Sequence, residues 1–140
     1  MSQYRVSVVI PAKNEAATLG SVVESISRHL PGSEVLVVDD GSDDQTAEIA
    51  ASAGARVVRH HYSRGNGAAV KAGARAACGD VLVFIDADGQ HDAAEIPRLP
   101  AQIESGCDMA VGARTHSSQA SHGRKWANRF YNWLASYMAG

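Results

Sequence analysis

Short apolar runs rich in β-branched residues alternate with segments of helical periodicity, and this alternation constrains the fold more than any other feature. It predicts strands at residues 5–10, 35–38, 56–59, 81–85 and 109–111, with Pro11 ending the first strand. Helices are predicted at residues 19–30, 42–53, 68–78 and 93–105, the last one interrupted by Pro97 and Pro100, and again from residue 122 onward. Strands that alternate with helices form a mostly parallel sheet with helices on both faces, so the predicted fold class is α/β.

The helix boundaries are predicted from capping residues and from glycines. Ser42 or Asp43 is expected to cap the second helix, because a short polar side chain can accept a hydrogen bond from the first free backbone N–H groups. Gly54 is expected to end that helix, and Gly79 the following one.

The length of 140 residues suits one domain, which we place at residues 1–112. A polar segment begins at residue 113, and Trp126, Phe130, Trp133 and Tyr137 then form an aromatic stripe beside basic residues. Such a stripe is typical of a helix that lies in a membrane interface, and the alternative is a helix packed on the domain. The formal net charge of -2 shows no basic excess, so we expect no nucleic-acid partner.

The expected location follows from what the sequence lacks. The N-terminal residues carry no signal-peptide core, and no apolar run reaches the roughly 18 residues of a membrane span. Two cysteines without a cysteine-rich framework fit a reducing compartment. We therefore expect a cytoplasmic protein, peripheral on the inner face of a membrane, that contacts the membrane surface or a membrane partner.

Polar clusters follow three of the predicted strands, at residues 12–15, 39–44 and 86–92. The carboxyl ends of parallel strands meet at one sheet edge, where ligands of such folds bind. Asp86 and Asp88 repel each other unless a cation lies between them, and oxygen ligands suit Mg²⁺ or Mn²⁺. With Gln90 as a further oxygen ligand they predict a divalent metal site. The alternative is a polar turn in which Asp92 caps the next helix.

Two further positions are candidates for nucleotide binding. Asp40 can accept hydrogen bonds from the ring N–H groups of uracil or guanine, and the alternative is a turn residue before Gly41. Gly67 stands at the start of a helix, where a backbone without a side chain can approach a phosphate. The alternative for Gly67 is a flexible loop that leads into an alanine-rich helix.

Five stretches, in one order, cover nearly the whole chain: SVVIPAKNEAATL, VLVVDDGSDDQT, GNGAAVKAGARAACGDVLVFIDADGQHD, IPRL and DMAVGAR. Together they resemble the family-2 glycosyltransferases of the GT-A fold, especially the branch that makes polyprenyl- or dolichyl-phosphate sugars. The resemblance implies a Rossmann-like nucleotide-sugar-binding domain. It also implies a role for each matching residue, namely Pro11, Ala12 and Glu15 in the nucleotide pocket, Asp40 on the base, Asp86 and Asp88 on the metal and diphosphate, Gln90 beside the metal, Arg114 near the phosphates and Arg124 at the acceptor phosphate.

The implied reaction is metal-dependent transfer of a sugar, with inversion, from a UDP- or GDP-linked donor to a polyprenyl or dolichyl phosphate. A lipid phosphate is already anionic, so its attack needs no general base. Family members continue beyond the position of Gly140, so we expect the acceptor part to be incomplete here. The competing hypothesis is a nucleotide-sugar-binding or docking protein without turnover, and exposed apolar surface would favour a homo-oligomer.

Overall fold

The computed structural model describes residues 4–90 and 92–106. The chain divides into two units, residues 1–110 and 111–140, and the described residues all belong to the first. The strand predicted at residues 109–111 and the helix predicted from residue 122 lie outside the described residues.

The described residues contain a four-stranded parallel sheet with the strand order β3-β2-β1-β4. The strands are β1 (Val6–Ala12), β2 (Glu34–Asp39), β3 (Arg56–Arg59) and β4 (Val81–Phe84). In the register, Ala12 of β1 lies opposite Asp39 of β2, and Val9 lies opposite Phe84 of β4. The loops that follow β1, β2 and β4 therefore leave the sheet at the same edge, as the sequence predicts.

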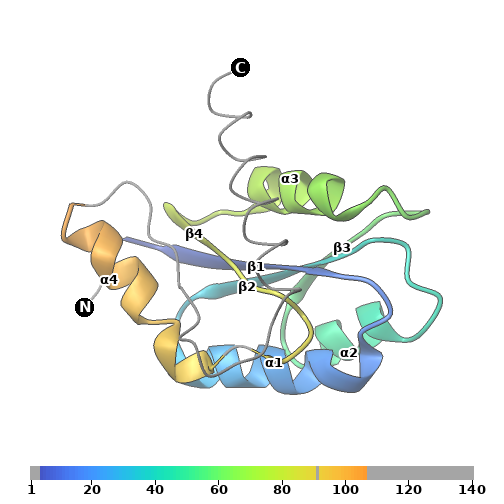
Figure 1. Cartoon of the computed structure of the whole chain (residues 1–140), viewed down its shortest axis with the longest axis horizontal. Helices are drawn as coiled ribbons and strands as arrows, with labels where there is room; N and C mark the ends of the chain where they lie inside the picture. Colours follow the sequence, from blue (N-terminus) through green and yellow to red (C-terminus); the bar gives the residue numbers. More distant parts are fainter. Residues whose placement is uncertain (1–3, 91, 107–140) are drawn as a thin grey trace. The chain divides into compact units, whose positions relative to one another are not determined.

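Helices cover both faces of this sheet (Figure 1). One face carries α1 (Ala16–His29), α2 (Thr46–Ser52) and α4 (Arg98–Glu104), with the short 3-10 helix η1 (Ala93–Glu95) before α4. The opposite face carries α3 (Asn66–Ala76). The predicted α/β class with helices on both faces is thus confirmed.

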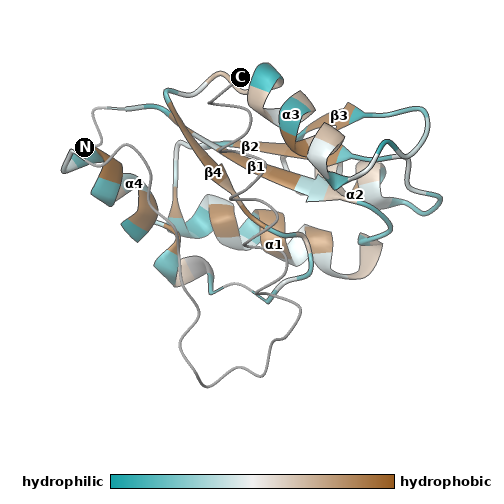
Figure 2. Cartoon of the chain, turned by 45° about the horizontal axis from the view of Figure 1, so that its top comes forward, coloured by the Kyte–Doolittle hydropathy of each residue, from teal (hydrophilic) through white to brown (hydrophobic). Residues whose placement is uncertain are grey.

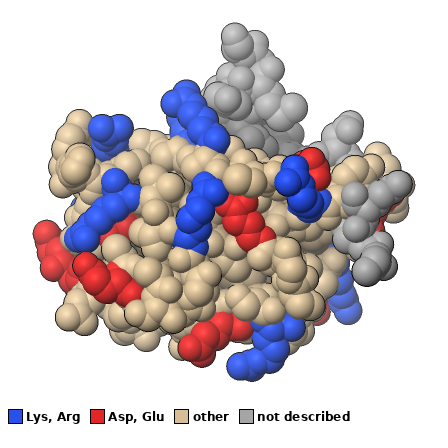
Figure 3. Space-filling model, turned by 180° about the vertical axis from the view of Figure 1, so that it is seen from behind, with Lys and Arg blue, Asp and Glu red and all other residues tan. Residues whose placement is uncertain are grey.

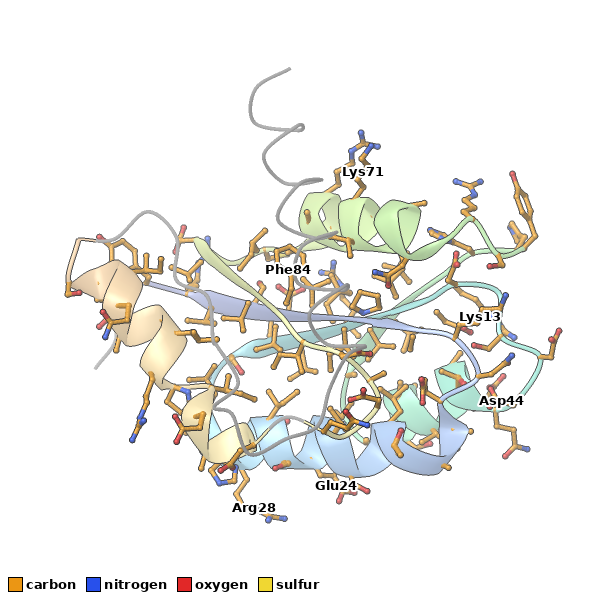
Figure 4. All side chains as sticks on the ribbon, viewed as in Figure 1. Lys13, Glu24, Arg28, Asp44, Lys71 and Phe84 are labelled. Atoms are coloured by element: carbon orange, nitrogen blue, oxygen red, sulfur yellow. The ribbon has the colours of Figure 1, made fainter. Side chains whose placement is uncertain are left out.

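The alternation of side chains along β1 produces two apolar clusters. Val8 and Ile10 face α1 and pack with Leu19 and Val23, whereas Val9 packs with Ala69 of α3 on the other face. Figure 2 shows the hydrophobic strands between the helices, and Figure 4 shows Glu24 and Arg28 of α1 and Lys71 of α3 pointing away from the sheet. The central strands β1 and β2 are covered on both faces, and this explains why their sequences are nearly continuous apolar runs.

Gly73 allows α3 to pack closely on the sheet. A Cβ atom at Gly73 would overlap the side chain of Val9 and would lie 3.1 Å from Val38 Cγ2. A larger residue would push α3 away from β1 and β2.

The expectation that Pro11 ends the first strand is wrong, because β1 continues through Pro11 to Ala12. The Val9 carbonyl accepts a hydrogen bond from Ile85 N–H on the β4 side, and the Ala12 carbonyl accepts one from Asp40 N–H on the β2 side. Successive residues alternate between the two neighbours, so the Pro11 nitrogen faces the side where β4 has already ended. No ladder partner is lost there, and the missing N–H is tolerated.

Two helix boundaries also differ from prediction. α3 begins at Asn66 and ends at Ala76, before Gly79. Gly79 instead lets the chain pass close to β1, since its N–H donates to Ser7 Oγ at 2.8 Å and a Cβ atom would lie 2.8 Å from the Arg5 carbonyl oxygen. The expected interruption of the helix at 93–105 occurs at Pro97, which separates η1 from α4, whereas Pro100 lies within α4 and does not interrupt it.

Candidate functional site

The loops after β1 and β2 are joined to each other by hydrogen bonds. Asn14, at a left-handed φ of 54°, donates from its backbone to Ser42 Oγ at 2.9 Å, and its side-chain oxygen accepts from Asp43 N–H at 2.9 Å. Glu15 N–H donates to Thr46 Oγ1 at 3.1 Å. The segment PAKNE is thus held against the segment DDGSDDQT.

This junction explains why the predicted cap of the second helix is wrong. α2 begins at Thr46, and Ser42 and Asp43 are engaged with Asn14 instead. The Asp44 carboxylate accepts from Thr46 N–H at 3.0 Å and from Ala16 N–H at 3.3 Å, and so serves the first turns of both α1 and α2. Hydrogen bonding, mainly from the Thr46 hydroxyl, lowers the pKa of Asp44 below its ordinary value.

Asp40 lies at the end of β2 and is almost fully buried. Its Oδ1 accepts from His60 Nδ1 at 2.8 Å and from Arg64 N–H at 2.9 Å. Its Oδ2 accepts from Ser63 Oγ at 3.0 Å and from Gly65 N–H at 2.9 Å. Each oxygen therefore has two donors, which fills the roughly four lone-pair sites of a carboxylate.

The electrostatics of Asp40 follow from this arrangement. Burial alone would raise its pKa, but the donors of Arg64, His60, Gly65 and Ser63 together outweigh burial and lower the pKa below its ordinary value. In this structure the residue predicted to meet a base holds the loop of residues 60–65 in place. Neither His60 nor Ser63 stood out in the sequence, since both lie 20 or more residues from Asp40.

The neighbouring Asp39 is fully buried and differs from Asp40 in its partners. Its Oδ1 accepts from Ser42 N–H at 3.0 Å, whereas its Oδ2 has no hydrogen-bond donor and lies 3.4 Å from Arg59 Nε. Arg59 also reaches Glu48 at 3.3 Å. Asp39 is thus a buried polar group at this edge for which the sequence predicted no role of its own.

The turn after β4 presents the second pair of carboxylates. Asp86 and Asp88 are both half-buried, and Gly89 between Asp88 and Gln90 adopts a left-handed φ of 75°. Asp88 Oδ1 accepts from Gln90 N–H at 2.9 Å, which closes the turn. Gln90 is exposed. The three predicted metal ligands thus belong to one short turn.

A cleft of about 360 Å³ lies between this turn and α1. The two carboxylates line it together with small polar and apolar side chains, and the full lining is Ala17, Thr18, Ser21, Val22, Ser25, Ile26, Ile85, Asp86, Asp88, Gly89 and Ile96. Apolar side chains such as Val22, Ile26 and Ile96 therefore line the cleft together with the two acidic groups.

The remaining predicted residues are placed as follows. Pro11 and Ala12 are buried in β1, and the half-buried Glu15 precedes α1. Gly67 is exposed in the first turn of α3. Arg114 and Arg124 lie outside the described residues.

The Asp40 loop and the Asp86 turn are neighbouring parts of one sheet edge. They follow β2 and β4, which lie on either side of β1, so they are two strand spacings apart, or about 10 Å.

The carboxylates of the β4 turn suit a Mg²⁺ or Mn²⁺ site that a substrate and water complete, rather than a site formed entirely by protein ligands. Across residues 4–90 and 92–106 no group of three or more His, Cys, Asp or Glu residues converges on a metal position. Mg²⁺ is commonly bound by one or two carboxylates and completes its coordination with phosphate oxygens and water. Asp86 and Asp88 are the residues of this turn that could form such a partial ligand set.

The sequence of residues 7–139 matches the family described as glycosyl transferase family 2. The chain belongs to that family. An uncharacterized glycosyltransferase of Mycobacterium bovis is 42% identical over 114 residues, which cover 81% of this chain and 50% of the relative. An undecaprenyl-phosphate 4-deoxy-4-formamido-L-arabinose transferase of Pseudomonas fluorescens is 37% identical over 139 residues, 91% of this chain and 40% of the relative. The chain therefore spans half or less of these relatives' lengths.

A solved structure is similar in both fold and sequence. It is glucosyl-3-phosphoglycerate synthase from Mycobacterium tuberculosis, in complex with Mn²⁺, UDP and glucosyl-3-phosphoglycerate. The superposition has a TM-score of 0.66 at 37% sequence identity, and it covers 74% of this chain and 41% of the synthase chain. The same synthase has been solved with Mg²⁺ and UDP. The expected GT-A-type α/β fold and the family are confirmed.

Proposed function

We propose that this glycosyltransferase chain binds a nucleotide diphosphate sugar at the β1–β2–β4 edge and that Asp86, Asp88 and Gln90 hold a divalent cation against the diphosphate. The observation that carries the proposal is the open turn after β4, whose two carboxylates line a cleft of about 360 Å³. The related synthase supports the metal, because its structures contain Mn²⁺ or Mg²⁺ with UDP.

The bound cation would neutralise negative charge that builds up on the leaving diphosphate. The chain's own residues hold the donor. Asp86 and Asp88 fix the ion, Gly67 at the start of α3 lets the backbone approach a phosphate, and Arg114 adds a positive charge near the phosphates.

The base site, in this proposal, is formed by the loops around Pro11, Ala12, Glu15 and Asp40. Asp40 serves it chiefly by holding residues 60–65, because its oxygens already accept four hydrogen bonds. A direct contact between Asp40 and a uracil or guanine N–H group requires one of those donors to be displaced. Asp39 Oδ2, which lacks a hydrogen-bond donor, becomes available to the base if Arg59 moves aside.

A phosphate-bearing acceptor is supported by the relatives, whose names specify undecaprenyl phosphate and phosphoglycerate. We propose a polyprenyl phosphate, which attacks without a general base and inverts the sugar carbon, with Arg124 positioned at its phosphate. Phosphoglycerate is the second candidate, because the similar solved enzyme is a glucosyl-3-phosphoglycerate synthase.

The proposed acceptor places the protein at a membrane surface in the cytoplasm. Among the described residues no helix is long and apolar enough to cross a bilayer. Peripheral attachment through residues 122–140, and self-association, are expectations that vesicle flotation and light scattering test.

The reaction itself is tested by a transfer assay. Radiolabelled UDP- and GDP-sugars are incubated with Mn²⁺ and either polyprenyl phosphate or 3-phosphoglycerate, with EDTA as the metal-free control. The proposal expects label on the lipid phosphate that disappears with EDTA. Label only on phosphoglycerate would select the second acceptor, and transfer that persists in EDTA would contradict the metal site.

A further inference from the structure

A hydroxyl on α1 is hydrogen-bonded to the backbone of the turn that follows β4. Thr18 Oγ1 donates a hydrogen bond to the Ala87 carbonyl oxygen at 2.7 Å. Glu15 Oε2 lies farther from the same hydroxyl, at 3.4 Å. A hydroxyl has only one hydrogen to donate, so the shorter and stronger bond goes to Ala87.

Ala87 stands between the two carboxylates, and its side chain is fully buried. Its carbonyl belongs to the planar peptide unit that joins Ala87 to Asp88. A hydrogen bond to that oxygen therefore fixes the plane from which the Asp88 side chain projects. From the other side, Gln90 N–H holds Asp88 Oδ1 at 2.9 Å.

The turn also packs against the same part of α1. A Cβ atom at Gly89 would lie 3.8 Å from both Thr18 Cβ and Val22 Cγ2, so the backbone of the turn passes close to these side chains. Thr18 thus contacts the turn by a hydrogen bond at Ala87 and lies close to it at Gly89. Both carboxylates and Thr18 line the cleft described above.

We propose that Thr18 is a positioning residue of the nucleotide–metal site, which holds the Asp86–Gln90 turn in the geometry that a divalent cation requires. This inference rests on the proposed function of that turn. Metal ligands must be placed within a few tenths of an ångström, and partners behind the ligands typically contribute 10- to 100-fold in metal affinity. Thr18 acts on the turn through the Ala87 carbonyl oxygen.

Three substitutions in the 140-residue chain test this role. Thr18→Val removes the hydroxyl at nearly constant shape, Thr18→Ser restores a hydroxyl, and Ser27→Ala removes an exposed hydroxyl elsewhere on α1 as the matched control. Amide hydrogen exchange of the peptide containing residues 86–90 is measured without metal. Binding of UDP and GDP in the presence of Mn²⁺ is measured by calorimetry, and circular dichroism checks the fold.

We expect Thr18→Val to speed exchange in residues 86–90 by about 2- to 10-fold, the effect of losing one hydrogen bond. The same variant should weaken Mn²⁺-dependent nucleotide binding by about 10- to 100-fold. Thr18→Ser and Ser27→Ala should match the wild type. Unchanged exchange in Thr18→Val, faster exchange without weaker binding, or failure of Thr18→Ser to rescue would each overturn the role. If the wild type binds neither nucleotide, the proposed function fails, while metal-free exchange still reports whether Thr18 anchors the turn.

Discussion

Two strands of the sheet, β2 and β4, end in similar acidic sequences, yet the two turns that follow are built differently. After β2, Asp40 is nearly buried and accepts four hydrogen bonds, so its carboxylate is part of the scaffold. After β4, Asp86 and Asp88 are half-exposed and line a cleft. A carboxylate whose lone pairs are filled by its own chain stabilises a loop, whereas the two half-exposed carboxylates after β4 border a cleft. Figure 3 shows that Lys, Arg, Asp and Glu side chains are intermixed over the face drawn there.

The largest effect is expected from deleting the Asp40 carboxylate. Asp40→Ala leaves four donors of residues 60–65 without their acceptor and should lower the free energy of unfolding by about 3–5 kcal/mol. Asp88→Ala removes the hydrogen bond from Gln90 N–H in the turn after β4 and should cost less than about 1 kcal/mol. Urea denaturation of both variants measures the contrast, and equal losses would break the distinction between the two turns.

The glycines that follow these carboxylates sharpen the comparison. A Cβ atom at Gly41, where φ is 71°, would lie 2.5 Å from Ser63 N and 2.7 Å from Tyr62 C, both backbone atoms. Gly89, with a φ of 75°, has no such neighbour within 3.8 Å. We expect Gly41→Ala to cost about 3 kcal/mol from strain and overpacking, and Gly89→Ala about 1 kcal/mol from backbone strain alone. Thermal unfolding separates them, and similar losses would show that the packing of the 60–65 loop on Gly41 is unimportant.

A smaller effect is expected in acid. The pKa of Asp40 is lowered in the folded protein, so its contribution to stability is present above the unfolded-state pKa of about 4 and is lost as the pH falls through the lower folded value. Other carboxylates titrate in the same range, and comparison with Asp40→Asn cancels them. The difference in unfolding free energy between wild type and Asp40→Asn should shrink between pH 5 and pH 2. A difference that stays constant across this range would contradict the lowered pKa.

The fold follows from the sequence more closely than the site does. The strand at 56–59 has its predicted limits, and the shared edge of the three polar loops follows from parallel strand order. The start of α2 did not follow, because Ser42, Asp43 and Asp44 are all good capping residues and only the contact with Asn14 selects among them.

The sequence also did not predict that the two acidic turns differ in their hydrogen bonding. The donors to Asp40 come from residues 60–65, whose pairing depends on how β3 returns the chain to the sheet edge. Thr18 reaches Ala87 across 69 positions of sequence. Periodicity locates helices and strands, but it does not show which carboxylate will accept hydrogen bonds from a loop distant in the sequence.

Calorimetric titration of the chain with UDP and GDP, with and without Mn²⁺, tests the central claim most directly. The wild type should bind one of the two nucleotides in a manganese-dependent way, and Asp88→Asn should weaken that binding at least about 100-fold, or roughly 2.7 kcal/mol, with little change in thermal stability. Wild-type protein that ignores both nucleotides in the presence of manganese, or an Asp88→Asn variant that binds as tightly as the wild type, would contradict the account.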